Sequence, residues 1–202
     1  MKNTFLILGL TGLLIACNPK KNASTNNQDN VVVNAETATL NQLNQMIEKE
    51  PNNAEFLFYR GLRYQDQEDY TASIADLSKS IELDSTKPVS YFNRGVSKYS
   101  LDDFEGAVAD YNMAIRLKPD YADAIYNRAI IHDTRQDYQK AIEDYNLVLK
   151  FNPDNMDAMY YRGLDYLVLK KNDLACADFK ATADKGYEDG KEAYQKYCVG
   201  KK

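Results

Sequence analysis

Apolar residues recur with the spacing of amphipathic helices from about residue 36 to residue 198. In residues 88–121 the first helical set comprises Tyr91, Phe92, Val96 and Tyr99. A second set covers one broad face over residues 104–117. Asp102 and Asp103 separate the two sets, and either carboxylate can cap the second helix, whereas Pro119 cannot extend that helix. The pattern predicts an antiparallel helical hairpin.

This hairpin pattern returns every 34 residues. Residues 122–155 repeat residues 88–121 with nine identical positions. An arginine and an aspartate recur with the same period. The arginines are Arg60, Arg94, Arg128 and Arg162, and the aspartates are Asp76, Asp110, Asp144 and Asp178. A single hairpin cannot bury both of its faces, so a repeat of this length predicts hairpins that stack on one another.

Three positions of the repeat carry a consistent residue size when each unit is counted from Ala54, Pro88, Ala122 and Met156. Position 8 is small in Gly61, Gly95, Ala129 and Gly163, and position 20 is small in Ser73, Ala107, Ala141 and Ala175. Position 24 is large in Leu77, Tyr111, Tyr145 and Phe179, and proline occupies position 32 in Pro119 and Pro153. On these residues the chain resembles the tetratricopeptide repeat family. The resemblance implies an all-α fold, a right-handed α-solenoid of stacked antiparallel helical hairpins.

The repeat divides the chain into segments. Residues 1–16 are predicted to be a signal peptide, 17–35 a flexible tether, and 36–53 an amino-terminal half-repeat that caps the stack. Four hairpins follow at 54–87, 88–121, 122–155 and 156–189. The final segment, 190–202, is predicted to hold a capping helix and a tail; the apolar residues place this helix at about residues 188–198.

The amino-terminal segment has the pattern of an exported protein. Lys2 precedes a short apolar run over residues 5–16, which is too short to be a confident membrane span. The run ends in Leu-Ile-Ala-Cys, which resembles the lipobox of bacterial lipoproteins and implies that Cys17 carries lipid. The alternative is an ordinary signal peptide with a chance cysteine. Because Asn18 is not aspartate and no acidic cluster follows Cys17, we expect a lipid-anchored protein in the bacterial cell envelope, on the periplasmic side of the outer membrane.

Composition narrows the functional classes. The net charge is −5 and no basic stripe is present, which argues against nucleic-acid binding. His132 is the only histidine, and the cysteines lack metal-ligand spacing, so neither a zinc site nor any other metal or cofactor site is expected. No glycine-rich phosphate loop or catalytic triad pattern is present. We expect no enzymatic activity, no cofactor other than the lipid, and no small-molecule substrate.

The arginine and aspartate series fall at positions 7 and 23, which lie opposite each other in an antiparallel hairpin. They predict four ion pairs, Arg60–Asp76, Arg94–Asp110, Arg128–Asp144 and Arg162–Asp178. The favoured interpretation is structural, a series of partly buried pairs that sets the register of the helices. The alternative is a charged surface that binds a ligand.

Two cysteines remain besides Cys17. Cys176 lies on the second helix of the fourth hairpin, and Cys198 lies on the helix expected to pack against it. Export would place them under oxidising conditions, which favours a disulfide. The alternative is a pair of buried free thiols.

The family resemblance implies that the first helix of each hairpin lines a concave groove. Position 5 is aromatic in every repeat and position 6 is polar or aromatic, which predicts a groove of Phe58, Tyr59, Phe92, Asn93, Tyr126, Asn127, Tyr160 and Tyr161. Packing between hairpins is the alternative for the aromatic series. The basic residues with which some family members hold a terminal carboxylate are missing, and Glu55, Asp123 and Asp157 favour a neutral or basic ligand.

These features predict a membrane-anchored scaffold that binds a peptide or protein segment in its concave groove. A second hypothesis is a structural subunit of a cell-envelope complex that docks by its convex face or its termini and binds no free peptide.

Overall fold

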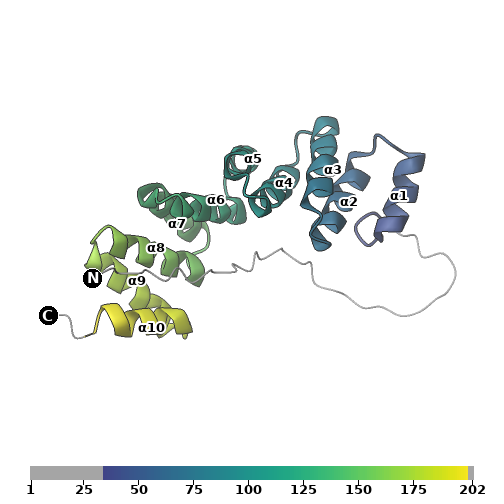
Figure 1. Ribbon diagram of the computed structural model, residues 1–202. Helices are drawn as coiled ribbons and strands as arrows, with labels where there is room; N and C mark the ends of the chain where they lie inside the picture. Colours follow the sequence, from purple (N-terminus) through teal and green to yellow (C-terminus); the bar gives the residue numbers. More distant parts are fainter. Residues whose placement is uncertain (1–33, 200–202) are drawn as a thin grey trace, which may run out of the picture. The chain divides into compact units, whose positions relative to one another are not determined.

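The computed structural model describes residues 34–199. Across this range the chain forms helices and no strand (Figure 1), and the helices are α1 (Leu40–Lys49), α2 (Ala54–Asp66), α3 (Tyr70–Leu83), α4 (Pro88–Ser100), α5 (Phe104–Leu117), α6 (Ala122–Thr134), α7 (Tyr138–Phe151), α8 (Met156–Val168), α9 (Asn172–Asp184) and α10 (Glu188–Tyr197). Within residues 34–199 the predicted all-α solenoid is therefore confirmed. No helix in the same range is long and apolar enough to cross a membrane.

Tight turns connect the two helices of each hairpin. One residue in each turn adopts a left-handed backbone, with φ of 61° at Glu68, 59° at Asp102, 63° at Gln136 and 57° at Lys170. An aspartate follows this residue in the first three hairpins. In the first two its side chain accepts a hydrogen bond from the first turn of the second helix, at 3.0 Å for Asp69 from Ala72 N and 2.9 Å for Asp103 from Gly106 N. Of the two candidate caps named from the sequence, Asp103 therefore caps α5, and Asp102 forms the turn.

The hairpins α2–α3, α4–α5, α6–α7 and α8–α9 stack in chain order, and each packs mainly against its neighbours in sequence. The large side chains at position 24 fill the interior of each hairpin, because Leu77, Tyr111, Tyr145 and Phe179 are fully buried. The small residue at position 8 makes room for them. A Cβ atom added to Gly95 would lie 2.7 Å from the Tyr111 ring, so glycine lets α4 and α5 approach closely.

The amino-terminal cap buries Ala35, Ala38 and Leu43 against the first hairpin. Thr39 begins α1 with a capping box, in which its side chain and that of Gln42 each accept a hydrogen bond from the other's backbone N–H. Arg63 Nε donates to the Ala38 carbonyl at 3.0 Å. Ala35 was predicted to be the last residue of a flexible tether, but it is 4% exposed because the chain already turns back onto α1 at this point. Residues 17–33 of that tether, which include Cys17, and the predicted signal peptide lie outside the described residues.

The carboxyl-terminal capping helix, expected at about residues 188–198, spans Glu188–Tyr197 and so begins two residues before the segment 190–202 assigned to the cap and tail. The turn from α9 to α10 repeats the geometry used inside each hairpin, with Gly186 in the left-handed region at φ 83°. Tyr187 occupies the position at which Pro119 and Pro153 end earlier hairpins. Because this turn is tight, α10 begins at Glu188 and packs directly on α9.

The predicted disulfide between Cys176 and Cys198 is present and joins α9 to the end of α10, with the two Cα atoms 5.6 Å apart. Ala193 of α10 is buried in the same cluster as Ala175 and Phe179 of α9. The cap is thus held by a covalent bond as well as by apolar contacts.

Candidate functional site

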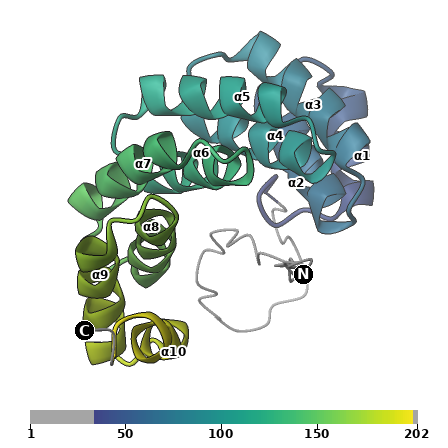
Figure 2. The same cartoon turned by 60° about the vertical axis from the view of Figure 1, so that its left-hand side comes forward.

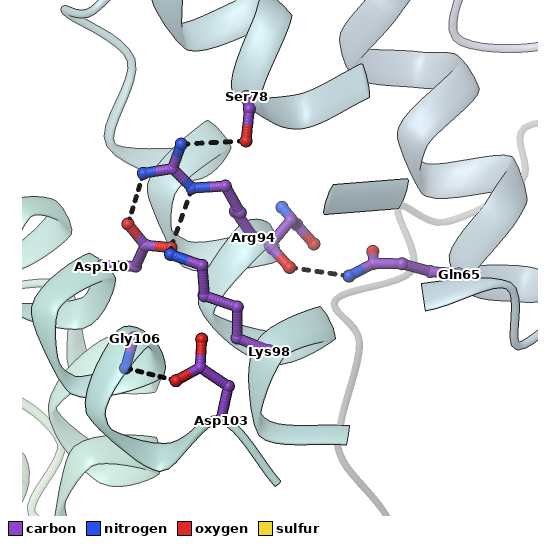
Figure 3. A network of polar contacts seen from close by, with 8 residues as sticks. Gln65, Ser78, Arg94, Lys98, Asp103, Gly106 and Asp110 are labelled. Carbon is purple, nitrogen blue, oxygen red and sulfur yellow. Dashed lines mark hydrogen bonds and ion pairs between the residues drawn. The ribbon is translucent and has the colours of Figure 1, made fainter. Parts of the chain in front are cut away.

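Each arginine of the repeat contacts the aspartate of its own hairpin through two hydrogen bonds. In the second hairpin Arg94 Nε and Nη2 donate to the two carboxylate oxygens of Asp110 at 2.9 and 2.6 Å (Figure 3). The other three pairs, Arg60–Asp76, Arg128–Asp144 and Arg162–Asp178, have the same geometry with distances of 2.6–2.8 Å. The hydrogen bonds to Asp110 raise the pKa of the Arg94 guanidinium.

The third guanidinium nitrogen reaches the preceding hairpin. Arg94 Nη1 donates to Ser78 Oγ at 3.1 Å (Figure 3). Arg128 Nη1 donates to Asn112 Oδ1 at 2.5 Å. Arg60 and Arg162 make the equivalent bonds to Asn44 and Asn146. Each arginine therefore ties three helices together, which assigns it a role in stacking the hairpins. These acceptors were not predicted from the sequence, although Ser78, Asn112 and Asn146 share position 25 of the repeat.

Position 11 lies beside these pairs and varies between repeats. Lys98 Nζ adds a second cation to Asp110 at 2.8 Å, which Figure 3 also shows. His132 occupies the same position in α6, with Nε2 4.0 Å from Asp144. Burial lowers the pKa of His132, and its buried Nδ1 has no hydrogen-bond partner among the described residues. This environment fits a packed histidine.

The aromatic residues at position 5 lie between hairpins. Phe92 is 9% exposed, and its ring centroid lies 6.0 Å from that of Tyr111 and 5.1 Å from that of Tyr121. Tyr126 contacts Tyr145 at 5.9 Å and Tyr161 at 6.5 Å. These contacts account for Phe92 and Tyr126 by packing, which is the alternative that the sequence left open.

The remaining aromatic residues of the predicted groove are half-buried. Tyr160 contacts Tyr161, Phe179 and Tyr187 at centroid distances of 5.4, 5.9 and 5.8 Å. Phe58 and Tyr59 contact each other at 5.1 Å, and Tyr59 also packs against the amino-terminal cap. These side chains support the ends of the stack and leave only part of each ring exposed.

The two asparagines at position 6 differ in accessibility. Asn127 is buried, at 9% exposure. Asn93 is half-buried, and its Nδ2 donates to the Val89 carbonyl one turn earlier at 2.8 Å. Of this pair, Asn93 is therefore the one placed to meet a ligand.

A regular row of half-buried apolar side chains was not predicted. It occupies position 9 of the first helices and consists of Leu62, Val96, Ile130 and Leu164. In α4, Val89, Asn93, Val96 and Ser100 recur at intervals of three to four residues and so share one side of the helix. We call this side of α2, α4, α6 and α8 the inner face. Among the helices that carry it, α4, α6 and α8 lie on the inner side of the bend in Figure 2, and the second helices α5, α7 and α9 lie on the outer side. Position 9 is apolar in every repeat, and this regularity could have predicted the row from the sequence.

Acidic side chains accompany this face. Glu55 and Asp123 are exposed near the starts of α2 and α6. Asp157, at the start of α8, is half-buried and accepts a hydrogen bond from the Tyr187 hydroxyl at 2.6 Å. No cluster of potential metal ligands is found among residues 34–199.

The fold and the repeated arginine–aspartate contacts define an α-solenoid of stacked helical hairpins. Two family models match within it, one described as "Tetratricopeptide repeat" over residues 122–155 and one described as "TPR repeat" over residues 97–132. The first match covers the third predicted hairpin. The part of the solenoid that the two models match, residues 97–155, therefore consists of tetratricopeptide repeats.

Solved structures agree with this assignment. A crystal structure of MamA is 26% identical, with 78% of this chain and 87% of that chain covered at a TM-score of 0.67. YrrB, described as a TPR protein with an unusual peptide-binding site, is 16% identical, with 77% of this chain and 81% of that chain covered at a TM-score of 0.68. At this identity the likeness shows the fold alone. The first TPR domain of Spaghetti (RPAP3), bound to the HSP90 peptide SRMEEVD, is 28% identical, with 58% of this chain and 93% of that chain covered at a TM-score of 0.56. No curated protein matches the sequence.

Proposed function

We propose that this protein is a non-catalytic scaffold that binds an extended or helical segment of another protein along the inner face. The observation that carries the proposal is the row of partly exposed apolar side chains at position 9, one in each hairpin. A row at constant spacing offers a segment the same contact several times. Val89 and Asn93 extend it with an apolar contact and a carboxamide, which can both donate and accept hydrogen bonds.

The ligand we propose is neutral or basic. The RPAP3 domain was solved with an acidic peptide. In this chain position 2 is Glu55, Val89, Asp123 and Asp157, and no basic residue stands at positions 2, 5 or 6 of any repeat. Acidic groups on the inner face would repel an acidic segment and attract a basic one.

Val89→Asp is expected to weaken binding of a selected peptide about tenfold, since it places a charge in an apolar contact, where one lost contact of this size costs about 1.4 kcal/mol. Val89 is 38% exposed, so the melting temperature should stay near that of the wild type. The measurement is affinity for peptides selected from a random library against the purified protein.

Leu117→Asp is the matched control, because Leu117 is 39% exposed but lies at the end of α5, a second helix. The proposal requires that this variant keep wild-type affinity. If Leu117→Asp loses binding while Val89→Asp keeps it, the peptide binds the convex face and the proposal for the inner face is wrong. If no peptide can be selected at all, the structural-subunit hypothesis, which involves no free-peptide binding, is favoured instead.

We further propose that lipid on Cys17 anchors the scaffold in a bacterial outer membrane, facing the periplasm. The sequence ending in Cys17 supports the anchor, and the disulfide between Cys176 and Cys198 supports an oxidising compartment.

Cys17→Ser is expected to move the protein from the membrane fraction to the soluble fraction or to leave its signal peptide uncleaved, because serine cannot accept the thioether-linked lipid. Fractionation and intact-mass measurement after expression in a bacterial host test this. Cys176→Ser is the control that keeps Cys17. A Cys17→Ser protein with unchanged mass and membrane association would disprove the anchor.

A further inference from the structure

One buried aspartate in the described part of the chain has no arginine. The buried aspartates there are Asp76, Asp110, Asp144, Asp165 and Asp178, and all except Asp165 receive two hydrogen bonds from an arginine of their own hairpin. Asp165, in the middle of α8, is only 1% exposed. An isolated buried carboxylate is costly unless a cation or hydrogen bonds offset the loss of water.

The group facing Asp165 is another carboxyl. Asp133, near the end of α6, lies close enough to Asp165 for the two carboxyls to share a hydrogen bond once one of them carries a proton. Burial and the neighbouring Asp133 raise the pKa of Asp165 to about 8. This environment favours the proton on Asp165, the more buried of the two, and the negative charge on Asp133, the more exposed.

The fold does not demand this acidic pair. Asp133 and Asp165 stand at positions 12 and 10 of adjacent repeats. The same two positions hold Gln65 and Ser97 between the first and second hairpins, where Gln65 Nε2 donates to Ser97 Oγ at 2.8 Å. Between the second and third hairpins they hold Tyr99 and the fully buried Ile131. A neutral or apolar pair thus serves the stack equally well.

Two buried polar atoms at this place lack a partner. Asp165 Oδ2 is one, and the hydroxyl of Tyr145, which reaches in from α7, is the other. Asp133 and Asp165 both act on the Tyr145 hydroxyl and help burial to raise its pKa, and Asp133 also acts on Tyr161 of α8. No lysine or arginine among residues 34–199 forms an ion pair with either aspartate.

The pair is reached from the inner face. Asp133 follows Ile130 of the apolar row by three residues on α6, which places it on the same side of the helix, and it is half-buried. A carboxylate that has already lost part of its water attracts a cation more strongly than a fully solvated one, because the local dielectric constant is lower.

We propose that Asp133 and Asp165 form the recognition site for one cationic side chain, lysine or arginine, of the segment bound on the inner face. The site deepens the proposed function and rests on it. The incoming cation occupies the place that an arginine fills at the other buried aspartates. Binding of the cation favours the form in which both carboxyls are ionised, so that near the titration midpoint of Asp165 the shared proton is released to solvent, whereas at lower pH the cation binds the charge on Asp133 and the proton stays.

The proposal is tested with small probes on the full chain in detergent. The probes are the N-acetyl methylamides of lysine and arginine, with that of norleucine as the uncharged control, and the titration of Asp165 is followed by carboxyl ¹³C NMR. At about ten times their dissociation constant, the cationic probes should lower the midpoint for Asp165 by about one pH unit, because they bind the ionised pair more tightly. The norleucine probe should leave the midpoint unchanged.

Three variants locate the effect. Asp133→Asn should weaken binding of the cationic probes about tenfold or more at pH 6, since it removes the accessible partner of a partly desolvated charge pair. Asp165→Asn resembles the protonated side chain, so at pH 6 it should bind as the wild type does but lose the rise in affinity above pH 8. Asp173→Asn, which removes an exposed charge from α9, should change nothing.

The proposal is overturned if the lysine and arginine probes leave the Asp165 titration unchanged up to their solubility, or if Asp133→Asn binds them as the wild type does. The peptides selected for the Val89 experiment separate this result from the proposed function. If the selected peptides lose affinity in Val89→Asp but keep it in Asp133→Asn, the proposed scaffold function is supported and the cation site is not. If the cationic probes lower the titration midpoint of Asp165 while Val89→Asp keeps full peptide affinity, the cation site is supported and the proposed binding along the inner face is not.

Discussion

Arg128→Ala is expected to lower the free energy of unfolding of the hairpins around it by about 3–5 kcal/mol, the cost of removing one partner from a buried ion pair. Asp144 is 6% exposed and would keep its charge without a hydrogen-bonded cation. The variant also removes the contact to Asn112 of the preceding hairpin. Hydrogen exchange of the α6 and α7 amides, compared with those of α2 and α3, measures the loss where it occurs.

A double variant separates charge from packing. Arg128→Met together with Asp144→Leu replaces the pair by apolar side chains of similar size, which is often neutral for stability when a buried pair is exchanged as a whole. We expect this double variant to recover most of the stability that Arg128→Ala loses. If the α6 and α7 amides of Arg128→Ala exchange at the wild-type rate, the pair does not stabilise the stack. The alternative interpretation, in which the arginine series is a surface that binds a ligand, is then favoured.

Replacement of both Cys176 and Cys198 by serine is expected to reduce the stability of the carboxyl-terminal cap by about 3 kcal/mol, on the chain-entropy model for a loop of this length. The two residues are separated by 22 positions. Because α10 has a neighbour on one side only, the loss should appear as local opening of α10 before the rest of the stack unfolds.

Hydrogen exchange again provides the measurement. The amides of Lys191 and Cys198, which donate to the carbonyls of Tyr187 and Tyr194 at the two ends of α10, should exchange faster in the variant, while those of α4 to α7 should be unchanged. Reduction of the wild-type disulfide should reproduce the effect. Equal protection of α10 in the variant would show that the apolar contacts of Ala193 hold the cap without the covalent bond.

The sequence was sufficient for the helical hairpin and its period. Apolar spacing, turn residues and the return of Arg and Asp after 34 residues are local or periodic signals, and they require no knowledge of the third dimension. The opposition of positions 7 and 23 follows from antiparallel geometry, and the structure places all four pairs in contact. The two cysteines could be paired for the same reason, since they lie on adjacent terminal elements.

Which side chains of the first helix are accessible was decided only by the tertiary structure. Positions 5 and 6 are adjacent in sequence, and a small rotation of a helix against its neighbours determines which of them faces solvent. Stacking places Phe92 and Asn127 in the interior and leaves Val89 and Asn93 accessible. No propensity or period encodes that rotation, because it depends on the volumes of residues from two hairpins at once.

The acidic pair is the clearest example of a contact that the sequence does not predict. Asp133 and Asp165 are 32 residues apart and occupy different positions of the repeat, and in the sequence each looks like an ordinary polar residue on a helix. Their meeting follows from the way α8 docks on α6 and α7, which withdraws Asp165 from water and sets it against a second carboxyl. The sequence by itself determined the repeated unit and its internal contacts, whereas the contacts between units, on which any binding surface depends, came from packing alone.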